Sequence, residues 1–113
     1  MLRGFRVILP YVRSVTLSSY GKTPLRIGIY GSGNLYVAFG EDPYSLKMIS
    51  VFIRGAMDRL KRDEFFFNRP ELKRYEDDIL ASGYFEHTGE VEVASYYTYP
   101  IWRFRNVDDL FTE

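Results

Sequence analysis

The residues of this chain that are best suited to catalysis are a histidine and its acidic neighbours. His87, the only histidine, lies in the segment Glu86-His87-Thr88-Gly89-Glu90. An imidazole titrates near neutral pH and can act as a general base, and a nearby carboxylate can orient it. One hypothesis is therefore a small nuclease or related hydrolase that uses His87 with Glu86 and Glu90. The alternative is a solvated surface histidine, since the segment reads as a loop that enters a strand.

The residue inventory excludes several other kinds of site. The chain contains no cysteine and a single histidine, which rules out thiolate metal sites, disulfides, cysteine nucleophiles and metal sites that need two histidines. The glycine-rich segment at 28–33 matches neither the dinucleotide-binding fingerprint nor the phosphate-binding loop. A serine hydrolase triad is not expected either, because no Gly-x-Ser-x-Gly turn is present. We therefore predict no bound metal and no cofactor.

Arginine and tyrosine side chains alternate with apolar ones in the predicted strands, which favours a different chemistry. If the strand at 101–105 turns its arginines to the same side as the hairpin at 25–39, one exposed sheet face carries Arg6, Arg26, Tyr30, Tyr36, Arg103 and Arg105. Tyrosine rings stack on unpaired bases, and arginine binds phosphate or stacks. The pattern predicts a non-enzymatic module that binds nucleic acid or an acidic protein surface. The alternative is a set of ordinary solvent-facing residues that pair across strands.

The charge distribution supports a charged partner. The chain has 15 basic and 15 acidic residues and a formal net charge of zero. Residues 1–40 nevertheless contain no acid, and their bases are Arg3, Arg6, Arg13, Lys22 and Arg26. Such an asymmetry between two parts of a chain favours a charged partner.

Alternating apolar residues predict strands in both the N-terminal and the C-terminal part of the chain. The N-terminal third reads as strand at 5–9 and 12–18, then as a hairpin at 25–29 and 35–39 whose turn is formed by 31–34. Further strands are expected at 90–97 and 101–105, followed by an acidic tail at 106–113.

Two helices are predicted between these strands. Asp42-Pro43 is a typical helix start, and a helix at 42–62 follows from apolar residues spaced three and four apart, namely Leu46, Ile49, Ile53, Met57 and Leu60. A second helix should begin near Asn68 and end at Gly83. The predicted fold class is α+β, a mostly antiparallel β-sheet of about four to six strands with two helices packed on one face, in the order β-β-β-α-α-β-β.

Three consecutive aromatic residues, Phe65, Phe66 and Phe67, lie between the predicted helices. Three successive side chains cannot all point into one core, so the plainer interpretation buries two of them and leaves one partly exposed. The alternative is a homodimer or partner contact through Phe65, Phe66 and Phe67.

A third hypothesis for function is compatible with the compact size, namely a protein-interaction factor or inhibitor encoded by a virus or mobile element.

Length and composition set the remaining expectations. A chain of 113 residues is expected to form a single globular domain over 1–113. Its N-terminus lacks the apolar core of a signal peptide, and no segment is apolar enough to cross a membrane, so a cytoplasmic protein without a membrane partner is predicted. Glutamine and cysteine are absent and asparagine is scarce, a composition reported for proteins of thermophiles.

Overall fold

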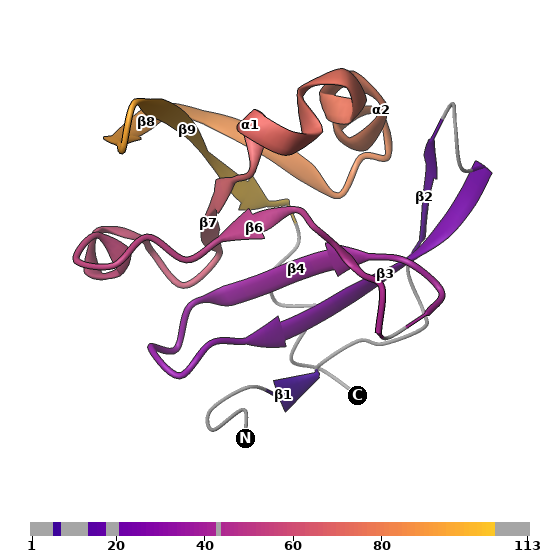
Figure 1. Ribbon diagram of the computed structural model, residues 1–113, viewed down its shortest axis with the longest axis horizontal. Coiled ribbons are helices and arrows are strands. Elements are labelled where there is room, and N and C mark those ends of the chain that lie inside the picture. The colour runs from indigo at the N-terminus through magenta and orange to yellow at the C-terminus, as the bar shows by residue number, and fades with distance from the viewer. Residues whose placement is uncertain (1–5, 8–13, 18–20, 43, 106–113) are drawn as a thin grey trace.

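The computed structural model describes residues 6–7, 14–17, 21–42 and 44–105, with residues 6, 7, 14 and 15 described by their backbone only. In these residues the chain forms two antiparallel sheets and one helical stretch (Figure 1). The predicted class, a mixed α and β protein with antiparallel sheets, is confirmed. The predicted acidic tail at 106–113 and parts of the strands predicted at 5–9 and 12–18 lie outside the described residues.

The first sheet is built around the predicted N-terminal hairpin, which the structure confirms. Its strand order is β1-β3-β4-β5, and β2 pairs with the first part of β3. In the register of β3 and β4, Ile27 lies opposite Val37 and Leu25 opposite Phe39, so their side chains share one buried face. The strands are β1 (Arg6–Val7), β2 (Ser14–Leu17), β3 (Gly21–Ile29), β4 (Leu35–Phe39) and β5 (Lys47–Met48).

The second sheet has the order β6-β7-β9-β8, with all neighbouring strands antiparallel. Its strands are β6 (Ser50–Val51), β7 (Glu64–Phe67), β8 (Phe85–Ala94) and β9 (Tyr97–Phe104). The predicted C-terminal helix is present as a continuous helical stretch made of α1 (Arg69–Leu72), a 3-10 turn η2 (Lys73–Tyr75) and α2 (Glu76–Ala81). In Figure 1 this stretch covers the second sheet on the side drawn at the top.

The main hydrophobic core joins both sheets and the helical stretch. Ile27 and Val37 of the first sheet, Phe67 and Trp102 of the second, and Ile79 of α2 all belong to it and are fully buried. Phe67 stacks on Trp102 with ring centroids 3.8 Å apart and ring planes 4° apart. Removing so much apolar surface from water is the principal source of stability in a chain of this size.

The prediction of a helix at 42–62 is wrong. This segment contains β5, β6 and a 3-10 turn η1 (Met57–Arg59), and Gly55 has a φ of 85°, which interrupts a right-handed helix. The backbone of Ile49 bonds to distant segments and not to a helical turn, since its N–H donates to the Val37 carbonyl (2.9 Å) and its carbonyl accepts from the Asn68 N–H (2.8 Å). The apolar residues of the segment are spaced as in a helix, but Ile49 packs in the main core, whereas Ile53, Met57 and Leu60 pack in a second cluster.

The expectation that one of the three consecutive phenylalanines is exposed is also wrong. Phe65, Phe66 and Phe67 lie on β7, a central strand with both faces covered, and none is more than 1% exposed. Strand alternation sends Phe65 and Phe67 into the main core and Phe66 into a second cluster with Met57 on the other face. These three side chains therefore present no exposed surface for the predicted homodimer contact.

The predicted order of strands and helices is also not confirmed, and it departs from the structure at β7. β7 stands where a connection between two helices was expected, and the C-terminal strands pair with it rather than with the hairpin of β3 and β4. The two-sheet arrangement separates the parts of the basic and aromatic surface that the sequence predicts, because that surface requires the last strand to extend the first sheet.

Candidate functional site

The predicted basic and aromatic set is divided between the two sheets. Arg26, Tyr30 and Tyr36 belong to the β3–β4 hairpin, whereas Arg103 lies on β9 and Arg105 directly follows it. Arg6 is on β1, which pairs with β3, and its side chain lies outside the described residues. The structure therefore places four members of the predicted set on the first sheet, one of them described by its backbone only, and two on the second.

Tyr30 and Tyr36 form a small aromatic cluster with Phe52. The ring of Tyr30 meets Tyr36 edge to face at 5.5 Å and Phe52 at 5.3 Å between centroids. The hydroxyl of Tyr30 is hydrogen-bonded to Ser50 Oγ at 3.0 Å, and burial raises the pKa of Tyr30 above its ordinary value. Phe52 is 50% exposed, so this cluster has one open side.

Arg26 holds a loop next to this cluster. Its Nε donates to the Gly40 carbonyl at 2.9 Å, and its Nη2 donates to the Glu41 carbonyl at 2.7 Å. Gly28 and Ala38, which lie between Arg26 and the tyrosines on the same face, are buried. The face is thus only partly open, and its arginine is engaged by main-chain oxygens.

Arg103 and Arg105 both lie next to the carboxylate of Glu86. Arg103 Nη2 donates a short hydrogen bond to Glu86 Oε2, and Arg105 Nε lies 3.7 Å from Glu86 Oε1. The hydrogen bond from Arg103 holds the pKa of Glu86 below its usual range. These two arginines therefore do not form an open cationic surface.

His87 has a different carboxylate beside it than the sequence predicts. Its Nε2 lies 3.6 Å from Glu76 Oε2, and its ring contacts Trp102 at a centroid distance of 5.5 Å. Glu76 in turn accepts two hydrogen bonds from Arg69, at 3.1 and 2.8 Å. Glu76 is eleven positions earlier in the chain, so only the fold reveals this pairing.

The predicted catalytic set is not assembled. Glu86 pairs with Arg103, Glu90 pairs with Arg59, and neither contacts His87 through a hydrogen bond that the structure shows among the described residues. In the described part of the chain, no group of three or more histidine, aspartate or glutamate side chains is placed to hold a metal ion. No helix formed by these residues has the length and apolar character to cross a membrane.

The hairpin of β8 and β9 is the feature that stands out from the rest of the surface. The two strands pair from Phe85 opposite Phe104 to Ala94 opposite Tyr97, with a bulge between His87 and Val91. In Figure 1 the far end of this hairpin extends past α1 to the upper left of the molecule. This far end is where both strands lose the cover of other elements.

The turn that joins β8 to β9 has an unusual sequence for its geometry. Ser95 and Tyr96 have φ angles of 49° and 75°. Two consecutive positive φ angles define the tight turn that suits the twist of a hairpin, and Asn-Gly or Gly-Gly is the usual sequence there. A bulky L-residue such as tyrosine is strained in this region of backbone space.

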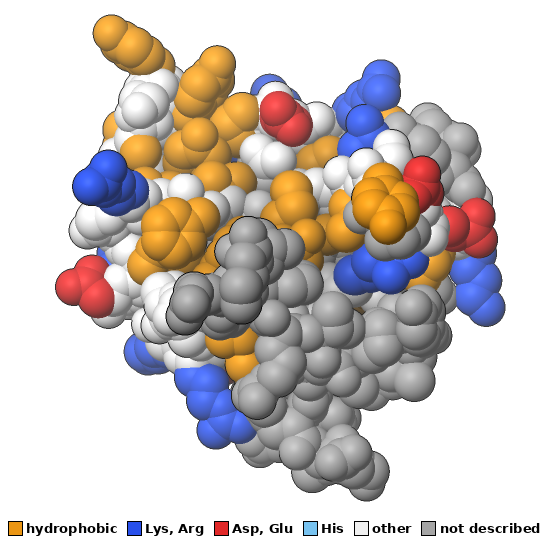
Figure 2. Space-filling view, turned by 60° about the horizontal axis from the view of Figure 1, so that its bottom comes forward, with side chains coloured by type: hydrophobic (Ala, Val, Ile, Leu, Met, Phe, Trp, Pro, Cys, Tyr) orange, Lys and Arg blue, Asp and Glu red, His pale blue; other side chains and the backbone are white. Residues whose placement is uncertain are grey.

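The far half of the hairpin carries a cluster of exposed apolar side chains. Tyr96 is 102% exposed, Val93 68%, Tyr97 53% and Val91 45%. Only two other large hydrophobic residues are exposed in the part of the chain that the structure describes, Tyr44 and Phe52. Figure 2 shows hydrophobic side chains gathered at the upper left, the end at which β8 and β9 meet in Figure 1.

Arg59 fixes the hairpin to the body of the protein. Its Nη1 donates to the Val91 carbonyl at 2.8 Å and to Glu92 Oε1 at 2.6 Å, and its Nη2 donates to Glu90 Oε1 at 3.0 Å. The hydrogen bonds to Glu92 and Glu90 raise the pKa of Arg59. One guanidinium thus holds both the main chain and the carboxylates of β8 at the point where the hairpin leaves the sheet.

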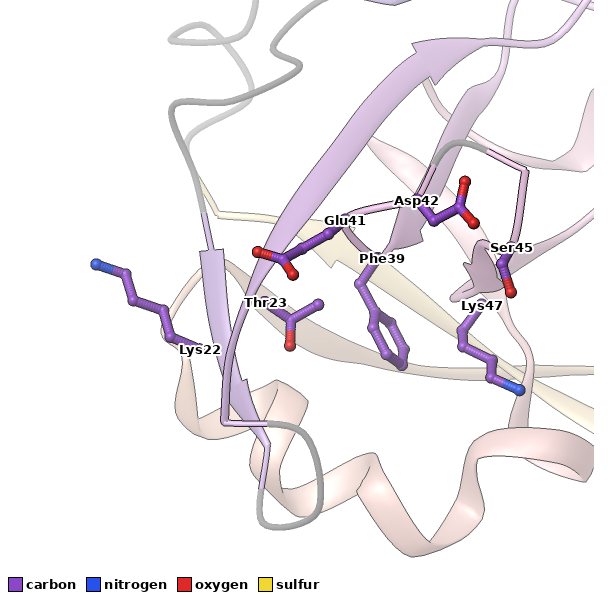
Figure 3. A pocket seen from close by; sticks show the side chains of 8 residues that line it. Lys22, Thr23, Phe39, Glu41, Asp42, Ser45 and Lys47 are labelled. Carbon is purple, nitrogen blue, oxygen red and sulfur yellow. The ribbon is translucent and has the colours of Figure 1, made fainter.

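A pocket of about 310 Å³ lies on the first sheet, near the loop that Arg26 holds. It is lined by Phe39, by Thr23 and Ser45, and by charged residues of both signs, including Lys22 and Lys47. Figure 3 shows Lys22 extending away from the Phe39 ring, and Lys47 on the other side of that ring. The polar groups do not converge on one point, as a specific small-molecule site requires.

The sequence pattern missed the hairpin as a candidate site. The turn, Ser95-Tyr96, contains no glycine, asparagine, aspartate or proline, and its serine alone is a weak turn signal. The available signal was compositional, since Tyr96, Tyr97 and Tyr99 lie in a segment, 84–101, that has no lysine or arginine.

Comparison with known proteins places the chain in no family. No family model matches it, and neither the curated proteins nor the solved structures contain a match.

Proposed function

We propose that this chain is a non-enzymatic binding module that engages a partner protein through the far end of the β8–β9 hairpin. The observation that carries the proposal is Tyr96, a fully exposed aromatic side chain held at a positive φ angle in a two-residue turn. A strained residue at a solvent-exposed position contributes no stability to the isolated chain that would offset its strain. Such outliers are concentrated at binding and catalytic sites.

The composition of the hairpin end supports this function. Tyrosine is among the residues that contribute most to protein interfaces, because it buries roughly 150–250 Å² and its hydroxyl retains a hydrogen-bond partner. Val93 and Tyr97 surround Tyr96 with further apolar surface. Apolar side chains gathered on an element that projects from a small protein mark an interaction site.

The charges near the hairpin favour a protein over a nucleic acid at this site. The segment 84–101 contains Glu86, Glu90 and Glu92 but no lysine or arginine. The side chain of Glu90 is 68% exposed even though it pairs with Arg59. A surface that approaches phosphate groups requires cations of its own.

A photo-crosslinking experiment tests the proposal. Benzoylphenylalanine replaces Tyr96 in one sample and Tyr44 in a matched control, because Tyr44 is 96% exposed but lies outside the hairpin. We expect irradiation in a native cell extract to join one protein to position 96 and not to position 44. The captured protein, once identified and purified, should bind Tyr96→Ala at least tenfold more weakly than the unmodified chain, while Tyr44→Ala binds normally. Equal binding by all three would refute the proposal.

A second candidate function is nucleic-acid binding by the aromatic cluster of the first sheet. The observation that favours it is the open side of this cluster, where Phe52 is half exposed and Tyr36 lies near Arg26. Single-stranded oligonucleotides should bind at low salt and dissociate as salt rises, and Tyr36→Ala with Phe52→Ala should weaken binding at constant salt. Fluorescence anisotropy with a labelled oligothymidylate measures this. The absence of salt-sensitive binding would eliminate this candidate.

A further inference from the structure

The two faces of the β8–β9 hairpin can be assigned from its register. Residues that lie opposite each other on antiparallel strands project to the same face. Val93 lies opposite Thr98, whereas Glu92 lies opposite Tyr99 and Ala94 opposite Tyr97. Val93 and Val91 therefore share one face of the hairpin, and Tyr97 shares the other with Glu92.

Each face is covered near the body of the protein and uncovered at the far end. Along β9, Thr98 is on the face of Trp102, which packs in the main core, and Tyr97 is on the face of Ile101, which packs in the second cluster. At the far end Val93 is 68% exposed and Tyr97 is 53% exposed. Apolar side chains are thus exposed on both faces of the same projecting element.

We propose that the partner protein has a cleft that receives the end of this hairpin and contacts both of its faces, an inference that rests on the proposed function. A flat partner surface can cover only one face of a two-stranded ribbon and would leave the apolar residues of the other face in water. Insertion into a cleft covers both faces and places Tyr96, at the turn, deepest in it. This is the geometry of a protein that blocks a cleft in another protein.

The charges of the hairpin indicate the chemistry of the two cleft walls. On one face the exposed side chains of Val91 and Val93 present apolar surface, which matches an apolar wall. On the other face Glu92 shares Arg59 with Glu90, so that two carboxylates are balanced by one guanidinium. Together these three groups carry one net negative charge, and a lysine or arginine on the second wall, which faces Glu92 and Tyr97, would complement it.

Arg59 acts in this arrangement as a positioning residue. Its hydrogen bonds to the Val91 carbonyl and to the carboxylates of Glu90 and Glu92 fix the direction in which the hairpin leaves the sheet. A ribbon that is held rigidly before binding loses less conformational freedom when it enters a cleft. The readout specific to this role is hydrogen exchange, which should become faster at residues 90–99 of free Arg59→Gln without a loss of the folded core.

The test uses benzoylphenylalanine at Val93 and, separately, at Tyr97, with the purified protein that is captured through Tyr96. Both positions should crosslink to that protein, and mass spectrometry should place the two crosslinks in different segments of its chain. Val93→Ala and Tyr97→Ala should each weaken binding about fivefold or more, and Tyr44→Ala, at an exposed position outside the hairpin, serves as the control. Circular dichroism and thermal unfolding verify that each variant is folded.

The outcomes separate the two proposals. If only one of the two positions crosslinks, or if only one of the two alanine variants binds more weakly, the partner surface is flat; the cleft is then excluded while the proposed function stands. If Tyr96, Val93 and Tyr97 all fail to capture a protein, both proposals fail. Capture of a nucleic acid through these positions would likewise refute both.

Discussion

The two long hairpins of this protein have the same topology and opposite surroundings. The β3–β4 hairpin turns through Gly33, whose φ of 91° suits glycine, and its inner face buries Leu25, Ile27, Leu35, Val37 and Phe39. The β8–β9 hairpin turns through Ser95 and Tyr96 at positive φ and exposes apolar residues on both faces at its far end. The comparison indicates that the first hairpin contributes to folding stability, whereas the second keeps apolar surface available for contact.

The largest difference between the two hairpins should appear in the free energy of unfolding when one apolar side chain in each is shortened to alanine. Ile27→Ala removes a side chain that is completely buried and should lower the free energy of unfolding by about 2–5 kcal/mol. Val93→Ala removes a side chain that is 68% exposed and should change it by less than about 0.5 kcal/mol. Urea denaturation measures both. A loss for Val93→Ala as large as that for Ile27→Ala would show that the end of the β8–β9 hairpin belongs to the core.

A smaller effect should follow from changing the turns. Replacing Ser95-Tyr96 with Asn-Gly relieves two strained residues and should raise the free energy of unfolding by about 1–2 kcal/mol, while binding of the captured partner is lost. The opposite change in the other hairpin is Gly33→Ala, which places a side chain at positive φ without any steric contact within 4 Å. It should lower the free energy of unfolding by about 1 kcal/mol. Chemical denaturation measures both. If the Asn-Gly variant is no more stable, the turn of β8 and β9 is not strained.

The smallest effect concerns pH at the base of the β8–β9 hairpin. Because Arg103 lowers the pKa of Glu86 from its ordinary value of 4.5 in the folded state, the ion pair contributes stability above the unfolded pKa. This contribution is lost as pH falls through the folded pKa. Arg103→Gln should therefore be less stable than the unmodified chain at pH 7, and the difference should shrink as the pH falls below the unfolded pKa and through the folded pKa of Glu86. NMR titration of the Glu86 carboxyl carbon checks the direction, and a pKa at or above the ordinary value would contradict it.

The sequence predicted those parts of the fold in which local patterns agree with tertiary structure. The hairpin of β3 and β4 was found because alternation and turn signals coincide, and the helical stretch from Arg69 to Ala81 because a proline start and a glycine stop enclose it. The helix predicted at 42–62 was wrong because the apolar spacing of this segment suits a helix. Its actual conformation is set by the hydrogen bonds of Ile49 to distant segments and by the positive φ of Gly55, neither of which this spacing reveals.

The candidate site was less predictable than the fold. Exposure of Tyr96 depends on how far the β8–β9 hairpin extends beyond the helices, and sequence periodicity carries no information about that distance. The pairing of Arg59 with Glu90 and Glu92 joins residues more than thirty positions apart. The basic and aromatic residues do not form one surface for a related reason. The sheet to which Arg103 belongs is decided by which strands pair with β9.

In the segment that contains β5 and β6, the backbone of Ile49 forms a hydrogen-bonded link between the two sheets. Ile49 donates its N–H to Val37 of the first sheet and accepts at its carbonyl from Asn68, which directly follows β7 of the second. Separating either sheet from this segment breaks the hydrogen-bonded path to the other and exposes the buried side chain of Ile49 to water. The two sheets are therefore expected to melt together, as one cooperative transition rather than as two independent units.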